Sequence, residues 1–156
     1  MPTRGVFSVF AELSFKGADM MDENKLKTVS SAALAYLGDS VIEVCVREYL
    51  VGEGYSSSSR LNALALDFVR ASKQAEAMKN ITPHLTEEEE AVFRRGRNIG
   101  HSSTPRSATV AQYRIATGME ALFGYLKLCG KEERISELFR IAYNIDKNNE
   151  NIKEEK

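Results

Sequence analysis

Two acidic residues lie in segments that are otherwise apolar. Asp39 lies within LAYLGDSVIEV and Glu120 lies within IATGMEALFGYL. Aspartate is unfavourable in a helix interior, and a buried carboxylate without a partner is costly, so each side chain needs a compensating group. Three arrangements would supply one: an ion pair with arginine, a proton shared between the two carboxylates, or a hard divalent cation that prefers oxygen ligands. The two segments by themselves do not distinguish among these three arrangements.

Glycines accompany both acids. Gly38 precedes Asp39, and Gly118 and Gly124 flank Glu120. Glycine is a poor residue for a helix interior, so its presence here predicts two helices that pack closely, backbone to backbone. Glu43 is four residues after Asp39 and shares its helix face.

Zinc and disulfide chemistry find little support. The chain has two His and two Cys without zinc-ligand spacing among them. Cys45 and Cys129 each lie in an apolar run, where a free cysteine behaves as a small hydrophobe. Two such cysteines fit a reducing compartment rather than a disulfide framework.

The charge distribution supplies a second chemical pattern. The chain carries 21 Lys and Arg against 22 Asp and Glu, a net charge of −1 that by itself argues against a nucleic-acid partner. Residues 91–119, however, contain no acid, although an even spread would place about four there. They contain five arginines, whose planar guanidinium groups suit phosphate oxygens: Arg94, Arg95, Arg97, Arg106 and Arg114.

The loop within this basic stretch adds further polar groups. Ser102, Ser103 and Thr104 offer hydroxyl donors, and Gly96 and Gly100 would let backbone approach a ligand closely. Carboxylates beside such a surface suggest Mg²⁺-dependent phosphodiester chemistry. The alternative is a solvated helix face on which the arginines pair with acids such as those at 87–90.

Helical periodicity predicts the elements that must position these residues. Apolar residues recur at three- and four-residue steps, which indicates five main helices, over about 30–50, 60–80, 86–98, 108–129 and 132–144. Thr86 and the acids after it form a capping box that opens the third helix. Residues 98–107 read as a polar loop, and no segment reads as a strand. We therefore expect an all-α fold.

The length suits a single domain with one hydrophobic core. We expect this domain at 29–145, an amino-terminal extension at 1–28 and a polar tail at 146–156. No run approaches the roughly 18 apolar residues of a membrane-spanning helix, and no secretory signal is recognisable. The chain is accordingly predicted to be cytoplasmic, without a membrane partner. Adjacent methionines at 20 and 21 leave open where translation starts.

Five segments in order resemble one known family. LAYLGDSVIEV and TGMEALFGYL resemble two conserved segments of ribonuclease III catalytic domains. RASKQAEAM, TEEEEAVFRRGRN and the loop ending in TP-R extend the likeness over about residues 30–142. The pattern is similar to that of the short bacterial branch, Mini-ribonuclease III, which lacks a separate double-stranded-RNA-binding domain.

The resemblance implies a specific function. It implies an all-α catalytic domain that forms a homodimer, with two active sites lining one cleft for double-stranded RNA. Asp39 matches the family's essential aspartate and Glu120 its late glutamate, which makes both catalytic residues and Mg²⁺ ligands. The expected substrate is precursor large-subunit (23S) ribosomal RNA, with a ribosomal protein as a candidate companion, and the products carry a 5′-phosphate and a 3′-hydroxyl.

The chain also departs from the larger family members. These carry two more metal-site acids, at positions occupied here by Ala35 and Thr117. Whether the site holds one or two metal ions is therefore open, and Glu43 is a further candidate ligand. The side chains expected to contact RNA are Arg94, Arg95, Arg97, Asn98, His101, Arg106 and Lys73. A non-catalytic RNA-binding module and a helical Mg²⁺-dependent nucleotide pyrophosphohydrolase are the alternative functions.

Overall fold

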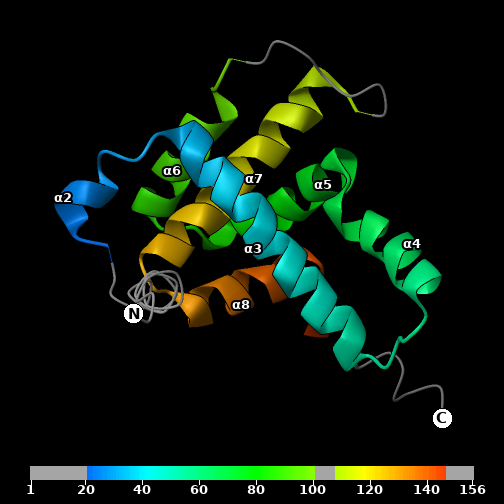
Figure 1. Ribbon diagram of the computed structural model, residues 1–156. Helices are drawn as coiled ribbons and strands as arrows, with labels where there is room; N and C mark the ends of the chain where they lie inside the picture. The colour runs from blue at the N-terminus through cyan, green and yellow to red at the C-terminus, as the bar shows by residue number, and fades with distance from the viewer. Residues whose placement is uncertain (1–20, 101–107, 147–156) are drawn as a thin grey trace, which may run out of the picture.

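The computed structural model describes residues 21–100 and 108–146, and these residues form α-helices joined by short connections (Figure 1). No strand occurs among them, so the predicted all-α fold is confirmed. The elements are α2 (Glu23–Leu26), α3 (Ser31–Gly52), α4 (Ser58–Val69), α5 (Ala71–Ile81), the short 3₁₀ helix η2 (Thr82–His84), α6 (Glu87–Arg97), α7 (Val110–Leu128) and α8 (Glu132–Ala142).

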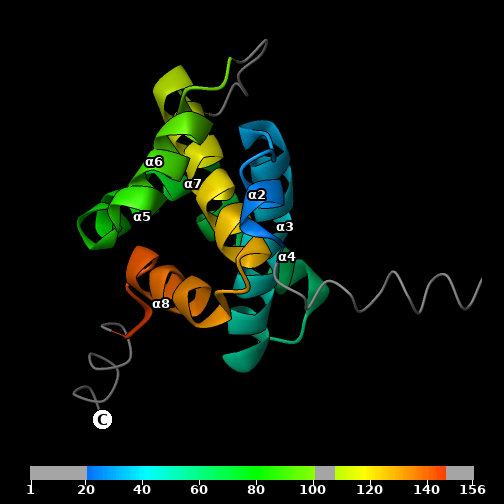
Figure 2. The ribbon, with the colours of Figure 1, turned by 90° about the vertical axis from the view of Figure 1, so that its left-hand side faces the viewer.

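Helix α7 is the centre of the domain. It packs against α3, α5, α6 and α8, and Figure 2 shows it between α6 and α3. Met119, Leu122, Phe123 and Leu126 of α7 are fully buried because neighbours surround this helix on most sides. Burial of this kind supplies the main favourable free energy of folding. Glu120 consequently belongs to the most buried helix of the fold.

The prediction of a single helix over residues 60–80 is wrong. The chain breaks at Arg70, whose backbone is extended (φ −61°, ψ 141°), and so forms α4 and α5 as separate helices. Helix α4 packs on α3, whereas α5 packs on α7 and α8. One straight helix could not reach both sets of neighbours. Neither glycine nor proline marks the break, so the local sequence carried no signal for it.

The region before the predicted domain is partly structured. Helix α2 lies within residues 1–28, and Asp22 caps it by accepting a hydrogen bond from the backbone N–H of Asn24. Leu26 and Val29 pack against the core. The extension therefore includes a helix that joins the domain, while the boundary near residue 28 stays a prediction.

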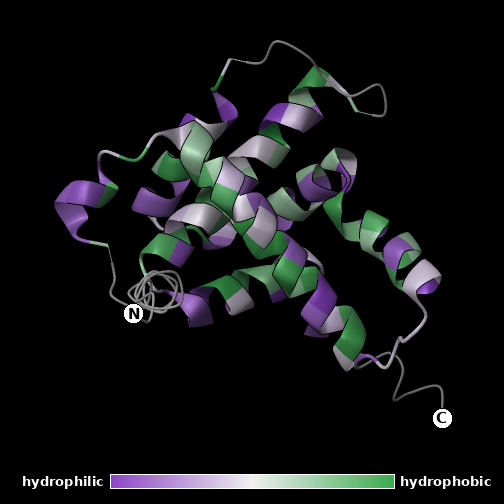
Figure 3. Ribbon diagram, in the orientation of Figure 1, coloured by the Kyte–Doolittle hydropathy of each residue, from purple (hydrophilic) through white to green (hydrophobic). Residues whose placement is uncertain are grey.

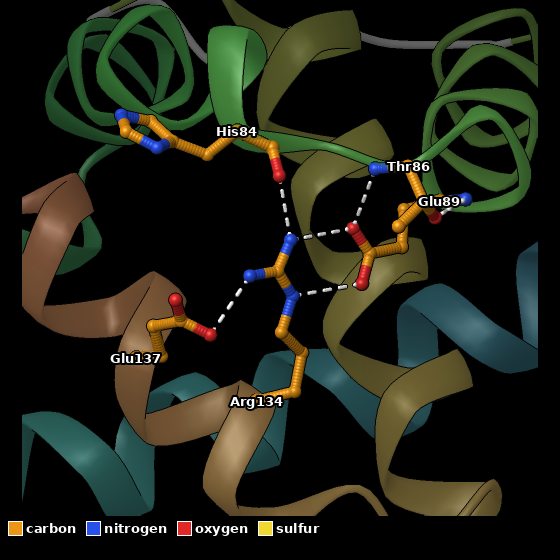
Figure 4. A network of polar contacts seen from close by, with 5 residues as sticks. All are labelled: His84, Thr86, Glu89, Arg134 and Glu137. Carbon is orange, nitrogen blue, oxygen red and sulfur yellow. Dashed lines mark hydrogen bonds and ion pairs between the residues drawn. The ribbon is translucent and has the colours of Figure 1, made fainter.

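The acidic run at 87–90 serves to start α6. Thr86 and Glu89 form the predicted capping box, in which each side chain accepts a hydrogen bond from the other residue's backbone N–H. Glu89 is buried and also accepts two hydrogen bonds from Arg134, both 2.9 Å long (Figure 4). These Arg134 bonds are the main reason that the pKa of Glu89 is lowered. The predicted capping box is confirmed.

Candidate active site

Helices α3 and α7 touch backbone to backbone where the two unusual acids lie. A side chain at Gly38 would collide with the carbonyl oxygen of Glu120, and one at Gly124 would collide with the carbonyl oxygen of Leu34. The close packing predicted from the glycines is confirmed for this pair. Because Gly38 precedes Asp39, the contact brings Asp39 and Glu120 to the same part of the molecule.

The other glycines of the region serve a different contact. A side chain at Gly118 would lie 2.7 Å from the ring of Phe93, and one at Gly96 would lie 2.6 Å from Cβ of Ala121. Both positions are buried between α6 and α7. The prediction that Gly96 lets backbone approach a ligand is wrong, because α7 occupies that space.

Asp39 and Glu120 line one cavity of about 520 Å³ between α3, α5 and α7. Most of its other walls are small or apolar side chains, and two tyrosines also lie along it. These residues are Ala32, Ala35, Tyr36, Val69, Ala71, Ile99, Tyr113, Ala116 and Thr117. The cavity therefore has space beside the carboxylates for water, a cation or part of a substrate.

Both carboxyl groups hold their protons more tightly than usual. Burial, and to a lesser degree the negative charge of Asp39, raises the pKa of Glu120 from 4.5 to about 8. Burial and the nearby Glu43 likewise raise the pKa of Asp39. Neither carboxylate forms an ion pair with another residue in the described part of the chain. The ion pair with arginine is therefore absent there, which leaves a shared proton or a bound cation.

The donor set suits a hard cation better than zinc. Within the described ranges, no group of three or more His, Cys, Asp and Glu side chains is arranged to hold a metal. Two carboxylates in a cavity with room for water fit Mg²⁺, which commonly binds one or two carboxylates and keeps several waters. Glu43 does not line the cavity, and its carboxylate accepts a hydrogen bond from Arg47 over 3.1 Å.

Comparison with known proteins agrees with this geometry. The model of the Ribonuclease III domain matches residues 32–131. Mini-ribonuclease 3 of Symbiobacterium thermophilum is 45% identical over 115 residues, which cover 74% of this chain and 88% of the relative. The chain belongs to the ribonuclease III family. Mini-ribonuclease 3 of Desulfitobacterium hafniense is 47% identical over 109 residues, covering 69% of this chain and 68% of the relative.

A solved structure supports the same assignment. A protein of Fusobacterium nucleatum whose crystal structure is known has 34% sequence identity to this chain. The two structures match with a TM-score of 0.69, over 76% of this chain and 95% of the Fusobacterium chain. The resemblance to the Mini-ribonuclease III branch is thus confirmed. Within this ribonuclease III fold, Asp39 and Glu120 come from α3 and α7, the two helices that meet at their backbones.

The basic residues predicted to contact RNA fall into three groups. Arg95 and Asn98 are exposed at the carboxyl end of α6, and Arg97 lies over the ring of Phe93, 5.7 Å from its centre. Arg94 pairs with Glu90, and Lys73 lies 3.7 Å from Glu76, so these two fit the solvated-face alternative. His101 and Arg106 lie outside the described residues.

The carboxyl end of α6 reaches the cavity. Ile99, two residues after Arg97, lines the cavity together with the two acids. Arg95 and Arg97 therefore belong to a segment that ends beside the carboxylates. Their assignment as RNA contacts stays a prediction.

Sequence reasoning missed one basic residue beside the site. Arg70 stands between Val69 and Ala71, both of which line the cavity, and its side chain is exposed. It forms no ion pair with the described residues. The helix break at Arg70 puts it there. Lys73 of the segment RASKQAEAM was predicted to contact RNA, whereas Arg70, its first residue, was not, because the break that exposes Arg70 has no local signal.

Proposed function

We propose that this chain is a Mg²⁺-dependent endoribonuclease that cleaves double-stranded RNA and matures the ends of precursor 23S ribosomal RNA. Its place in the ribonuclease III family makes it an endoribonuclease. One observation carries the metal dependence: Asp39 and Glu120 share a cavity and have no cationic partner among the described residues. The ribosomal substrate rests on the likeness to proteins named Mini-ribonuclease 3.

Asp39 and Glu120 would hold the Mg²⁺ ion in this mechanism. When bound, Mg²⁺ lowers the pKa of a coordinated water and stabilises charge on a phosphate. Gly38 and Gly124 keep the two helices in contact and so hold the carboxylates together. The small walls of the cavity leave room for the phosphate and the attacking water. Hydrolysis would leave a 5′-phosphate and a 3′-hydroxyl.

The basic end of α6 would orient the RNA. A-form RNA is recognised largely through its shape, its phosphates and its 2′-hydroxyl groups. Arg95 and Arg97 would contact phosphates near the cavity, and Arg70 would do so from the junction of α4 and α5. Binding by a few arginines should weaken steeply as salt rises.

Exposed apolar residues support the homodimer. Tyr36, Val44 and Val51 lie on one face of α3 at spacings of eight and seven residues, and they are 85%, 54% and 62% exposed. Leu66 of α4 is 43% exposed, and Figure 3 shows hydrophobic residues along both helices. Exposed Arg47, three residues after Val44 and four before Val51, lies on the same face, so this surface is apolar with a charged residue among its members. Exposed apolar residues that gather on one face commonly mark an interface. Two copies joined here would place two active sites in one assembly.

The dimer can be tested by one substitution. Val44→Asp should give a monomer in analytical ultracentrifugation, because it puts a charge within the apolar face. Val110→Asp is the matched control, since Val110 is 52% exposed on α7. A dimer that persists in Val44→Asp would place the interface elsewhere.

Cleavage of a structured precursor 23S RNA, with and without Mg²⁺, tests the activity. Asp39→Asn and Glu120→Gln should each abolish cutting without loss of helical content. Glu43→Gln is the matched control, because Glu43 lies one turn from Asp39 but outside the cavity, and it should cut normally. Salt-sensitive RNA binding without products at any Mg²⁺ concentration would favour the non-catalytic module. Turnover of free nucleoside triphosphates would favour a pyrophosphohydrolase.

A further inference from the structure

A second cavity, of about 280 Å³, lies between α3 and α8 and shares no lining residue with the cavity of the two acids. We call it the α3–α8 groove. Its floor is apolar, because Ile135, Phe139 and Ile145 are buried there and Cys45 and Tyr49 are half-buried. A single water takes about 30 Å³ of liquid volume, so the groove has room for several apolar groups. The described residues leave it unfilled.

The described part of the chain begins beside this groove. The backbone N–H of Met21 donates a 3.4 Å hydrogen bond to the carbonyl of Leu128, the last residue of α7. Helix α8 begins four residues later at Glu132, which lines the groove. Burial raises the pKa of the Cys45 thiol to about 11, and the charge of Glu132 contributes, so Cys45 lies near this end of the groove. Residues 1–20, which lie outside the described residues, are therefore tethered there.

The composition of residues 1–20 favours burial. Two basic residues, Arg4 and Lys16, balance two acidic ones, Glu12 and Asp19. Solvated segments typically have few aromatic residues and a high net charge, and this segment has neither property. Its apolar residues include positions three, four and seven after Val6, which is the spacing of one helix face. The valine, leucine and phenylalanine residues are Val6, Phe7, Val9, Phe10, Leu13 and Phe15.

The tether is long enough for these residues to reach the whole groove. Leu13 is eight residues before Met21, a length of chain that spans up to about 26 Å. Helix α8, with 11 residues, is about 16 Å long. The exposed apolar face of α3 is the other surface that could receive the segment. The groove is favoured because the hydrogen bond of Met21 fixes the tether beside it.

We propose that residues 1–20 bind back into the α3–α8 groove of the same chain, with Phe10 and Leu13 packed on its apolar floor. The contact would join the beginning of the chain to α3 and α8, and it does not depend on the nuclease activity. A short tether gives an effective concentration of about 1 mM, so even a contact with a Kd of about 0.1 mM would be occupied about ten to one. A chain that starts at Met20 or Met21 would lack this contact.

Cys45 is a natural probe of the groove because it lines it. Cys129→Ser leaves Cys45 as the one thiol of the chain, and mass spectrometry then follows its alkylation by N-ethylmaleimide at a fixed alkaline pH. The full chain is compared with a chain that starts at Met21 and with Phe10→Asp. Ser8→Asp is the matched control, since it adds the same charge two residues away, off the apolar spacing.

The full chain and Ser8→Asp should be alkylated about tenfold more slowly than the shortened chain and Phe10→Asp. A synthetic peptide of residues 1–20, added at about 1 mM, should restore protection to the shortened chain, and the same peptide with Phe10→Asp should not. Circular dichroism checks the fold, and Phe10→Asp carries the test if the shortened chain does not fold.

Two results would overturn the proposal. Equal alkylation rates in the full chain and Phe10→Asp would mean that the segment does not cover the groove. Protection that disappears when the full chain is diluted would mean that another copy supplies the segment, which contradicts binding within one chain.

Discussion

Replacing Glu120 by glutamine should stabilise the metal-free protein while abolishing its activity. Glu120 has a pKa of about 8 in the fold, against an ordinary value of 4.5, chiefly because it is buried. The folded protein thus binds this proton more tightly than the unfolded chain does. The resulting stability is fully present below about pH 4.5 and is lost as pH rises toward 8. Glutamine keeps the shape of the side chain and cannot ionise.

The magnitude follows from the two pKa values. Each pKa unit corresponds to about 1.4 kcal/mol, so the complete shift represents about 4–5 kcal/mol. Between pH 6 and pH 8, the wild-type free energy of unfolding should fall by about 2 kcal/mol, because Glu120 is ionised in the unfolded chain but still largely protonated in the fold. Glu120→Gln should not show this loss, so the difference between the two proteins should widen by about 2 kcal/mol over that interval.

Urea unfolding in the presence of a chelator measures this difference. Protein concentration must be constant, because a dimer's apparent stability depends on it. Glu76→Gln is the control, since Glu76 is exposed beside Lys73 outside the cavity, and the pH dependence of its free energy of unfolding should follow wild type. Adding Mg²⁺ at pH 8 should stabilise wild type and leave Glu120→Gln unchanged. Parallel stability curves for wild type and Glu120→Gln from pH 6 to pH 8 would refute this account of Glu120.

Three further predictions follow from particular contacts. Gly124→Ala should lower the free energy of unfolding by about 1–3 kcal/mol and reduce cleavage, because its methyl group would collide with a carbonyl of α3. Gly52→Ala, at a position with open space around it, should leave the melting temperature no lower than that of wild type. Arg134→Met should cost about 3–5 kcal/mol in urea unfolding at pH 7, because it leaves a buried carboxylate unpaired. Arg140→Met, which removes an exposed ion pair with Asp146, should lower the free energy of unfolding by less than about 1 kcal/mol. Arg70→Gln should weaken binding of RNA duplexes and lower the salt slope by about one, whereas Arg140→Gln should leave both unchanged.

None of the helices in the described ranges combines the length and the apolar character needed to cross a bilayer. This agrees with the sequence, where charged residues interrupt every long apolar run.

Local patterns predicted most of the helices and the two central acids. Thr86 identified the start of α6 because a capping box involves residues only three positions apart. Asp39 and Glu120 stood out because a carboxylate conflicts with an apolar helix segment, and that conflict is visible without a structure. Gly38 and Gly124 predicted a close helix contact because glycine is a poor residue for a helix interior, and that conflict is likewise visible in the sequence.

Other features depended on partners far away in the chain. The break at Arg70 arises because α4 and α5 pack on different helices, and no residue beside it signals a stop. Gly96 faces α7 rather than a ligand. Such outcomes depend on which surfaces meet, and one-dimensional periodicity does not contain that information.

The sequence by itself determined the helical class, the family and the identity of the two acids, because each rests on residue types and short spacings. Tertiary structure alone decided that Asp39 and Glu120 line one cavity and that no described cation neutralises them. The two acids are separated by 80 residues, and no local pattern in that stretch predicts that they lie together. It follows from the contact of α3 with α7 at Gly38 and Gly124, where the absence of side chains lets two backbones touch.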